Sequence, residues 1–176
     1  LAISKKFDSL INKPTKKHIL NTSGILNFSD FQFDMVRSGI GLYGFGNHIK
    51  FQNSLRPVIA LKTIISQIHK IQKGEHVGYN KGFKAKNTTT IATLPIGHAD
   101  GISRSYGQGK LRVLVNGNLV PTIGNICMDM LMIDVSKIKC NEGDTVTIFD
   151  DKNFTADEMG SLVGTISYEI LTSISN

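Results

Sequence analysis

Few side chains in this sequence are candidates for catalysis or ligand binding, and no single one lies in a pattern that identifies a reaction. Tyr79 follows Val77-Gly78 at the expected end of a strand, where its hydroxyl would ordinarily meet water. Arg37 suits a surface cation at another strand end, and His18 suits a histidine of the core. Cys127 fits a small apolar strand residue better than a nucleophile. No cysteine or histidine spacing matches a zinc site, so we expect no metal.

The elements that must position these residues change in type along the chain. The apolar spacing predicts a helix over residues 5–12, and an N-cap residue predicts a short helix over 29–34. Short apolar runs at 18–20 and 35–43 read as buried strands, with a loop of cap-type residues at 21–24 between them. This alternation is typical of parallel βα units. Because two strands cannot close a barrel, we predict that residues 1–46 are the tail of a larger α/β domain.

Beyond a polar stretch at 47–56 the pattern becomes that of a mainly β domain. The Asn116-Gly117 pair predicts a tight hairpin between strands at 111–115 and 118–120. Thr155 with Glu158 forms a capping box, and Ser167 is expected to cap the last helix. The other expected strands are 58–71, 88–96, 126–135 and 145–149. Their spacing predicts an antiparallel barrel or sandwich.

Composition excludes several classes of protein. The chain has 176 residues, is 40% hydrophobic and carries a net charge of +6. No apolar run reaches the roughly 18 residues of a membrane span, so we expect no membrane partner. The basic residues are scattered and lack interleaved aromatic residues, so we expect no nucleic acid. Two cysteines are too few for a disulfide framework and favour a reducing compartment such as the cytoplasm. The first residue is Leu1 rather than Met, which suggests a fragment or a processed chain.

Several motifs together resemble those of alanine racemase. The N-terminal ones are His18-Ile-Leu-Asn-Thr-Ser-Gly24 and Phe33-Asp-Met-Val-Arg-Ser-Gly-Ile-Gly-Leu-Tyr-Gly44. The later ones are Val77-Gly-Tyr-Asn80, Gly97-His-Ala-Asp-Gly101 and Ile126-Cys-Met-Asp129. The resemblance implies a cytoplasmic, pyridoxal 5'-phosphate-dependent isomerase that interconverts L- and D-alanine for peptidoglycan and works as a head-to-tail homodimer. Residues 1–46 would end its TIM-type barrel, and 47–176 would form its C-terminal β-domain.

The resemblance also assigns roles to individual residues. Tyr79 would be one of two catalytic bases; the other is a lysine for which no residue here matches the motif, so this chain alone is not expected to racemise alanine. A phenol has an unperturbed pKa near 10, so a cationic neighbour must favour its phenolate. The cofactor-binding residues would be Arg37 at the pyridine nitrogen, His18 behind it, Thr22, Gly39 and Ile40 at the phosphate, and Asn21 in their loop. The substrate-binding residues would be Met128, Asp129 and, at the entrance, His98.

Two positions depart from the family pattern, and two other functions remain open. His98 stands where the family usually has Tyr, and Asn125 stands where many relatives have Arg. Histidine at that position also fits racemase domains fused to a UDP-N-acetylmuramoyl-tripeptide:D-alanyl-D-alanine ligase, so such a fusion stays open. The alternatives to an enzyme are a non-catalytic β-barrel binding module and a β-domain that serves only dimerisation.

Overall fold

The computed structural model describes residues 2–11, 13–46, 48–51 and 54–174. The chain divides into two units, Leu1–Arg56 and Pro57–Asn176, and each is described by itself. The division falls at the C-terminal end of the polar stretch 47–56. No helix among the described residues is long and apolar enough to cross a membrane.

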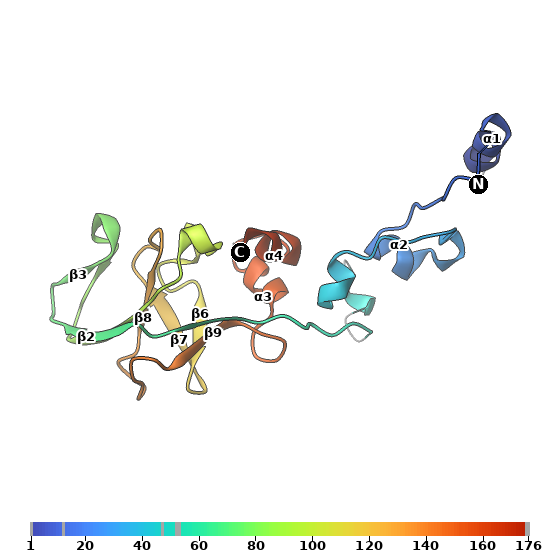
Figure 1. The fold of residues 1–176 in the computed structure, drawn as a ribbon. Coiled ribbons are helices and arrows are strands. Elements are labelled where there is room, and N and C mark those ends of the chain that lie inside the picture. The colour runs from blue at the N-terminus through green and yellow to red at the C-terminus, as the bar shows by residue number, and fades with distance from the viewer. Residues whose placement is uncertain (1, 12, 47, 52–53, 175–176) are drawn as a thin grey trace. The chain divides into compact units, whose positions relative to one another are not determined.

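The first unit consists of short helices joined by extended segments (Figure 1). The predicted helix over 5–12 is present as α1, although its predicted end at Asn12 lies outside the described residues. The predicted loop at 21–24 is wrong, because Asn21 is an N-cap whose side chain accepts the Gly24 N–H at 3.0 Å. The cap residue therefore begins the helix α2, where the sequence pattern had predicted a loop. The helical elements are α1 (Ala2–Leu10), α2 (Thr22–Asn27) and three 3-10 turns, η1 (Ser29–Phe31), η2 (Ile40–Tyr43) and η3 (Ile49–Phe51).

The two buried strands predicted in this unit are absent as regular strands. Residues 17–20 and 34–37 run in the same direction and share two backbone hydrogen bonds, Asp34 N–H to Lys17 O at 3.1 Å and Arg37 N–H to Leu20 O at 2.9 Å. No third segment of the described unit extends this pair. In the segment 17–20 only Leu20 is buried, and the C-terminal part of the strand predicted at 35–43 is instead the 3-10 turn η2. An extended pair without further neighbours cannot bury both faces, which explains the failed prediction.

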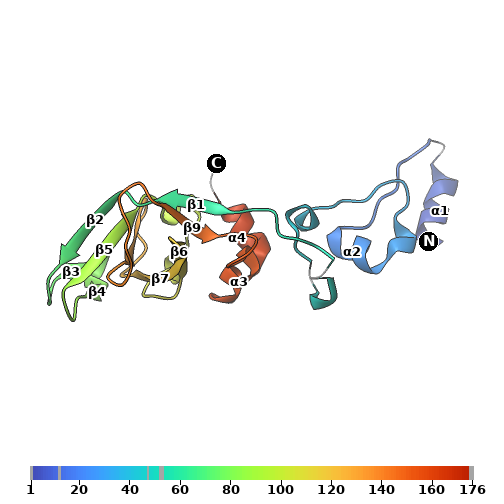
Figure 2. The ribbon, with the colours of Figure 1, turned by 90° about the horizontal axis from the view of Figure 1, so that it is seen from below.

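The second unit is built on one antiparallel sheet (Figures 1 and 2). Its seven strands follow the order β1-β9-β6-β7-β8-β5-β2, and β3 and β4 form a separate hairpin. This confirms the prediction of a mainly β, antiparallel domain. The strands are β1 (Leu61–Ile64), β2 (Gln67–Ile71), β3 (His76–Val77), β4 (Phe83–Lys84), β5 (Thr89–Leu94), β6 (Arg112–Val115), β7 (Asn118–Ile123), β8 (Leu131–Asp134) and β9 (Thr145–Phe149). The 3-10 turns are η4 (Tyr79–Lys81), η5 (His98–Asp100) and η6 (Arg104–Tyr106), and the helices are α3 (Ala156–Ser161) and α4 (Ser167–Ser173).

The run predicted as one long strand at 58–71 is instead two strands that belong to opposite edges of the sheet. β1 pairs with β9 and β2 pairs with β5. Between them, Ile65 N–H donates to Asp144 O at 3.0 Å and Ser66 N–H donates to Thr93 O at 2.9 Å. The sheet therefore curls so that its two edges meet at residues 65 and 66, which gives it a barrel-like form.

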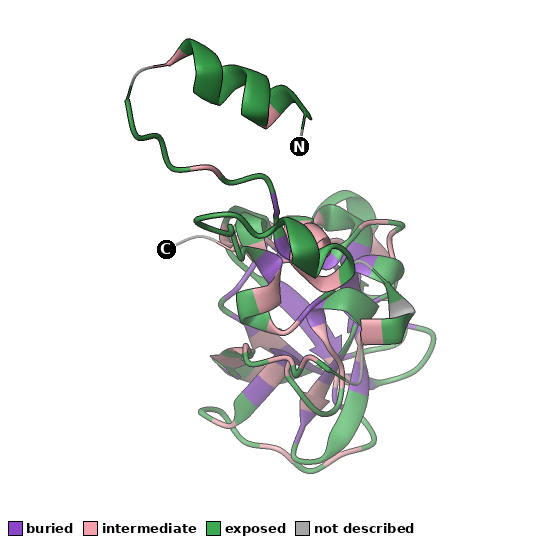
Figure 3. Cartoon of the chain, turned by 90° about the vertical axis from the view of Figure 1, so that its right-hand side faces the viewer, coloured by how far each residue is buried: buried purple, intermediate pink, exposed green. Residues whose placement is uncertain are grey.

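The core of the second unit lies inside this curled sheet, where Figure 3 shows the buried segments concentrated. Two hydrogen bonds join α3 to the sheet: Tyr106 donates its hydroxyl to Met159 O at 3.0 Å, and Thr122 donates its hydroxyl to Tyr106 O at 2.8 Å. The residues with the most deeply buried large side chains include Leu94, Ile102, Tyr106, Leu111, Leu131, Ile133 and Phe149.

The local predictions for this unit had mixed outcomes. The hairpin is confirmed, because Asn116 and Gly117 both have positive φ, 47° and 77°, between β6 and β7. The capping box of Thr155 and Glu158 at α3 is also confirmed. The prediction for Ser167 is wrong, because the N-cap of α4 is Ile166 and Ser167 is a buried first-turn residue.

Candidate active site

Tyr79 lies in a turn that leaves β3 abruptly. Gly78 has φ +74°, a conformation that an L side chain rarely adopts, and it turns the chain out of the sheet directly after Val77. Tyr79 then opens η4 with 67% of its surface exposed. Val77 anchors the base of the turn in a hydrophobic cluster, whose buried members are Ile71, Val77, Ala85, Ile91, Ile123 and Met132. The phenol is thus presented to solvent from a packed support.

A pocket of about 450 Å³ lies beside Tyr79. It is lined by Gly78, Tyr79, Cys127, Met128, Asp129, Met130 and Met132. The structure therefore brings together three of the predicted site residues, Tyr79, Met128 and Asp129. Cys127 packs against the hydrophobic cluster below the pocket, as expected of a small apolar residue. Its Sγ donates only a weak hydrogen bond to Asn125 O, at 3.8 Å.

The loop that carries Met128 and Asp129 is fixed by the residues around His98. The N–H of His98 donates to Cys127 O at 2.9 Å, and the N–H of Ala99 donates to Met128 O at 2.8 Å. A Cβ added to Gly97 would lie 2.5 Å from Met128 O, so only glycine permits this approach. The main chain of His98 thus supports the pocket. Its side chain, however, lines a different pocket of about 400 Å³ together with Ser103, Tyr106, Glu169 and others.

The remaining predicted residues lie in the first unit and form a second group. Thr22 is buried, and its Oγ1 accepts the N–H of Gly39 at 3.0 Å and of Gly41 at 3.2 Å. Among the hydrogen bonds of the described residues Thr22 Oγ1 is only an acceptor, which leaves its hydroxyl hydrogen to be donated elsewhere. Ile40 is also buried, and no hydrogen bond within the described part of the chain uses its N–H. This segment therefore offers two donors to an anion.

Arg37 and His18 form a pair in the same unit. Arg37 Nη1 and His18 Nδ1 lie 2.5 Å apart, and because guanidinium only donates, the imidazole nitrogen accepts. Both residues are exposed in this unit, so His18 does not lie in a core formed by the described residues. The prediction that His18 contacts Arg37 agrees with the distance.

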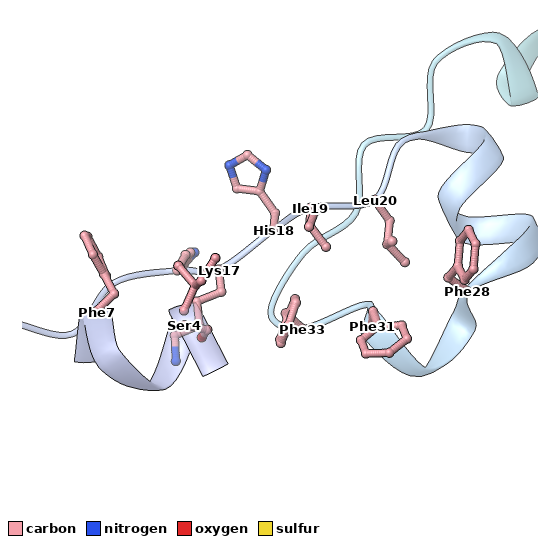
Figure 4. A pocket seen from close by; sticks show the side chains of 11 residues that line it. Ser4, Phe7, Lys17, His18, Ile19, Leu20, Phe28, Phe31 and Phe33 are labelled. Carbon is pink, nitrogen blue, oxygen red and sulfur yellow. The ribbon is translucent and has the colours of Figure 1, made fainter. Parts of the chain in front are cut away.

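His18 is also one of the residues that line an apolar pocket of about 710 Å³ (Figure 4). Its wall includes Ile19, Leu20, Phe31 and Phe33, and Figure 4 shows the His18 ring pointing away from the two phenylalanines. The pocket is lined mainly by carbon and carries none of the predicted anion-binding groups. We therefore assign it no catalytic part.

The sequence did not predict that Asn125 and Gln108 form hydrogen bonds beside Tyr79. Asn125 Nδ2 donates to Tyr79 O at 2.9 Å, and Gln108 Nε2 donates to Asn125 Oδ1 at 3.1 Å. In the sequence, Asn125 stands out only because it departs from the family pattern, and this does not indicate a contact with Tyr79. Gln108 carries no motif, and its nearness to Asn125 comes from tertiary structure. Within the described ranges no group of three or more His, Cys, Asp or Glu side chains is arranged to hold a metal ion.

Comparison with known proteins places the chain among racemases. A family model described as "Alanine racemase, C-terminal domain" matches residues 58–176. Alanine racemase 1 of Clostridium acetobutylicum is 42% identical over 185 residues, which cover 97% of this chain and 48% of that protein.

Two solved structures show the same similarity in three dimensions. Alanine racemase of Clostridium difficile 630 in complex with cycloserine matches with a TM-score of 0.87 and 35% identity, covering 98% of this chain and 47% of that one. Alanine racemase of Bartonella henselae with covalently bound pyridoxal phosphate matches with a TM-score of 0.83 and 33% identity, covering 99% and 48%. The chain thus spans about half the length of the relatives it matches.

Proposed function

The chain belongs to the alanine racemase family, and from this membership we propose that the complete protein interconverts L-alanine and D-alanine with pyridoxal 5'-phosphate as its cofactor. The observation that carries the proposal is the pocket in which Tyr79, Met128 and Asp129 meet. The protein would work as a head-to-tail homodimer, in which the second unit of one subunit completes the cofactor site of the other. Its product would be D-alanine for peptidoglycan.

The two units take different parts in this proposal. We assign residues 1–46 to the end of a parallel (β/α)8 barrel and residues 47–176 to the β-domain. The same-direction pairing of 17–20 with 34–37 supports the assignment. So do the exposed apolar side chains of Ile19, Phe28 and Leu42, which would be covered inside a larger barrel. The cysteines Cys127 and Cys140 are unpaired, which supports a reducing compartment such as the cytoplasm.

The first unit contains groups that fit the cofactor. A phosphate accepts hydrogen bonds, and the Thr22 hydroxyl and the Ile40 N–H are donors without an acceptor among the described residues. Gly39 lies between them, and Asn21 caps the helix that begins with Thr22. These residues would hold the phosphate at the C-terminal end of barrel strands, where such sites form.

Arg37 would face the pyridine nitrogen, with His18 as its support. When bound, the cofactor withdraws electrons from the substrate α-carbon and so lowers the cost of removing its proton. A guanidinium keeps its own proton, so Arg37 can donate a hydrogen bond to the ring nitrogen without protonating it. That choice limits electron withdrawal and favours simple proton exchange over transamination. The hydrogen bond to His18 fixes the guanidinium plane.

Racemisation needs two bases on opposite faces of the substrate. Tyr79 would take or return the α-proton on one face through its phenolic oxygen, and a lysine outside this chain would serve the other. The N–H of Met128 has no partner within the described part of the chain and would bind the substrate carboxylate. Asp129 lies beside it in the same pocket.

Replacement of Tyr79 by Phe in the complete protein tests the proposal. We expect racemisation to fall roughly 100- to 10,000-fold, the usual contribution of a general base, because the ring stays but the proton acceptor is lost. Rates are measured from both alanine enantiomers by polarimetry, with bound cofactor followed by its visible absorbance. Tyr168→Phe in α4 is the matched control and should retain the original rate. Near-normal turnover by Tyr79→Phe would remove Tyr79 as a base.

A further inference from the structure

The phenol of Tyr79 is exposed, and its place depends on its main chain. No hydrogen bond in the described part of the chain uses its hydroxyl, whereas its carbonyl oxygen accepts two. One comes from the N–H of Gly82 within the same turn, at 3.1 Å. The other comes from the Asn125 side chain, at 2.9 Å. Asn125 is thus a direct link between this turn and the strand-connecting segment beside it.

The orientation of the Asn125 amide is set by Gln108. Gln108 Nε2 donates to Asn125 Oδ1 at 3.1 Å, so the amide NH2 of Asn125 faces the Tyr79 carbonyl. Gln108 is itself tied to the same segment, because its N–H donates to Gly124 O at 2.8 Å. The three residues form a chain of hydrogen bonds that ends on Tyr79.

The backbone of the turn that Asn125 contacts is strained, so it needs contacts from outside the turn to stabilise it. Asn80 and Lys81 both have left-handed φ, 55° and 52°, which is rare for two successive residues other than glycine. The turn also packs closely on the amide, since a Cβ added to Gly82 would lie 2.8 Å from Asn125 Nδ2. A strained turn of this kind needs contacts from outside to fix it.

We propose that Asn125, oriented by Gln108, is a positioning residue that holds the strained turn so that Tyr79 reaches the substrate. The proposal rests on the proposed function of Tyr79 as a base. It predicts that breaking the bond harms proton transfer on the Tyr79 face of the substrate and spares the face that the lysine serves.

The test uses Asn125→Asp and Asn125→Ala in the complete, cofactor-loaded protein. Aspartate keeps the shape and can still accept from Gln108, but its carboxylate cannot donate to Tyr79 O. Asn118→Ala is the matched control, because the Asn118 amide also donates to a carbonyl, that of Asn116, in a distant turn. Two quantities are measured: exchange of the α-proton of each alanine enantiomer with D2O, and amide hydrogen exchange of the segment 79–82.

We expect both Asn125 variants to slow α-proton exchange from one enantiomer about 100-fold, the size of effect that a misplacement of about 1 Å produces. The other enantiomer should exchange as in the unaltered protein, and amide exchange should rise over 79–82 but not over the β6–β7 hairpin. Asn118→Ala should change neither quantity. Equal slowing of both enantiomers, or no slowing, would overturn the proposal.

Tyr79→Phe, measured in parallel, distinguishes failure of the positioning role of Asn125 from failure of Tyr79 as a base. If it slows one enantiomer while the Asn125 variants slow neither, the positioning role fails and the proposed function stands. If Tyr79→Phe changes neither rate, both fail together.

Discussion

His98 shows how the site can rely on a main chain and leave the side chain free to vary. Its N–H supports the loop of Met128 through Cys127 O, whereas its ring is exposed and has no hydrogen bond within the described residues. The resemblance to alanine racemase leads us to expect a tyrosine at this position. Because backbone bonds do not depend on the side chain, the substitution leaves the architecture of the site unchanged.

We therefore expect His98→Tyr to be tolerated in the complete protein. Exposed substitutions away from packing and networks usually change the free energy of unfolding by no more than about 0.5 kcal/mol. Because His98 does not line the Tyr79 pocket, we also expect kcat/KM to change less than about tenfold, which is about 1.4 kcal/mol in barrier height. The measurement is the steady-state racemisation rate from each enantiomer, together with the melting temperature. Loss of activity greater than a hundredfold would show that the ring itself takes part.

For individual residues, the sequence motifs predicted those proposed to contact the substrate but did not predict a residue that supports them. Tyr79, Met128 and Asp129 were predicted from their motifs, and the structure brings them to one pocket. The part played by Gln108 could not be predicted, because it depends on a contact across 17 residues of chain that no local pattern encodes. The sequence does not show whether a glutamine side chain forms hydrogen bonds with water or with another loop of the protein.

Among the elements, α3 receives a hydrogen bond from one buried tyrosine. Tyr106 is 1% exposed and donates its hydroxyl to Met159 O in α3. Burial raises the pKa of Tyr106 from 10.0 to about 12, because the charged phenolate is poorly solvated there. The hydroxyl therefore remains a donor at any pH near neutrality.

This shift predicts alkaline instability of the second unit. The unfolded tyrosine loses its proton near pH 10 and the folded one near pH 12, so its stabilising effect is complete below pH 10 and is lost as pH rises to 12. We expect the free energy of unfolding to fall over that range in denaturant titrations. Tyr106→Phe should be less stable by about 1 kcal/mol at pH 7 and should show a shallower fall. An equal fall in the variant would contradict this explanation.

The elements themselves were predictable where local chemistry decides them. The Asn116-Gly117 turn and the capping box of α3 each depend on neighbours in sequence, and each is present. The strand predicted at 58–71 depends instead on which edge each half pairs with, and it splits at Ile65. The strands predicted at 18–20 and 35–43 failed for a related reason, since burial of both faces needs further partners.

In the molecule as a whole, the groups assigned to the proposed racemisation are divided between the two units. Thr22, Ile40 and Arg37 lie in the first unit, whereas Tyr79 and Met128 lie in the second. The second base matches no residue of this chain, which spans 48% of the relative from Clostridium acetobutylicum. In the head-to-tail homodimer proposed above, each complete site would combine Thr22, Ile40 and Arg37 of one subunit with Tyr79 of the other.

Hybrid dimers test this requirement most directly. Complete subunits carrying Tyr79→Phe are mixed with complete subunits in which the lysine proposed as the other base is replaced, and racemisation is measured before and after subunit exchange. Each parent is expected to have little activity by itself, but in a hybrid one site would join an intact lysine with an intact Tyr79. We predict that activity appears on mixing and reaches about half that of the unaltered dimer for each hybrid formed. If hybrids form and stay inactive, both bases come from the same subunit, and the shared site proposed here is wrong.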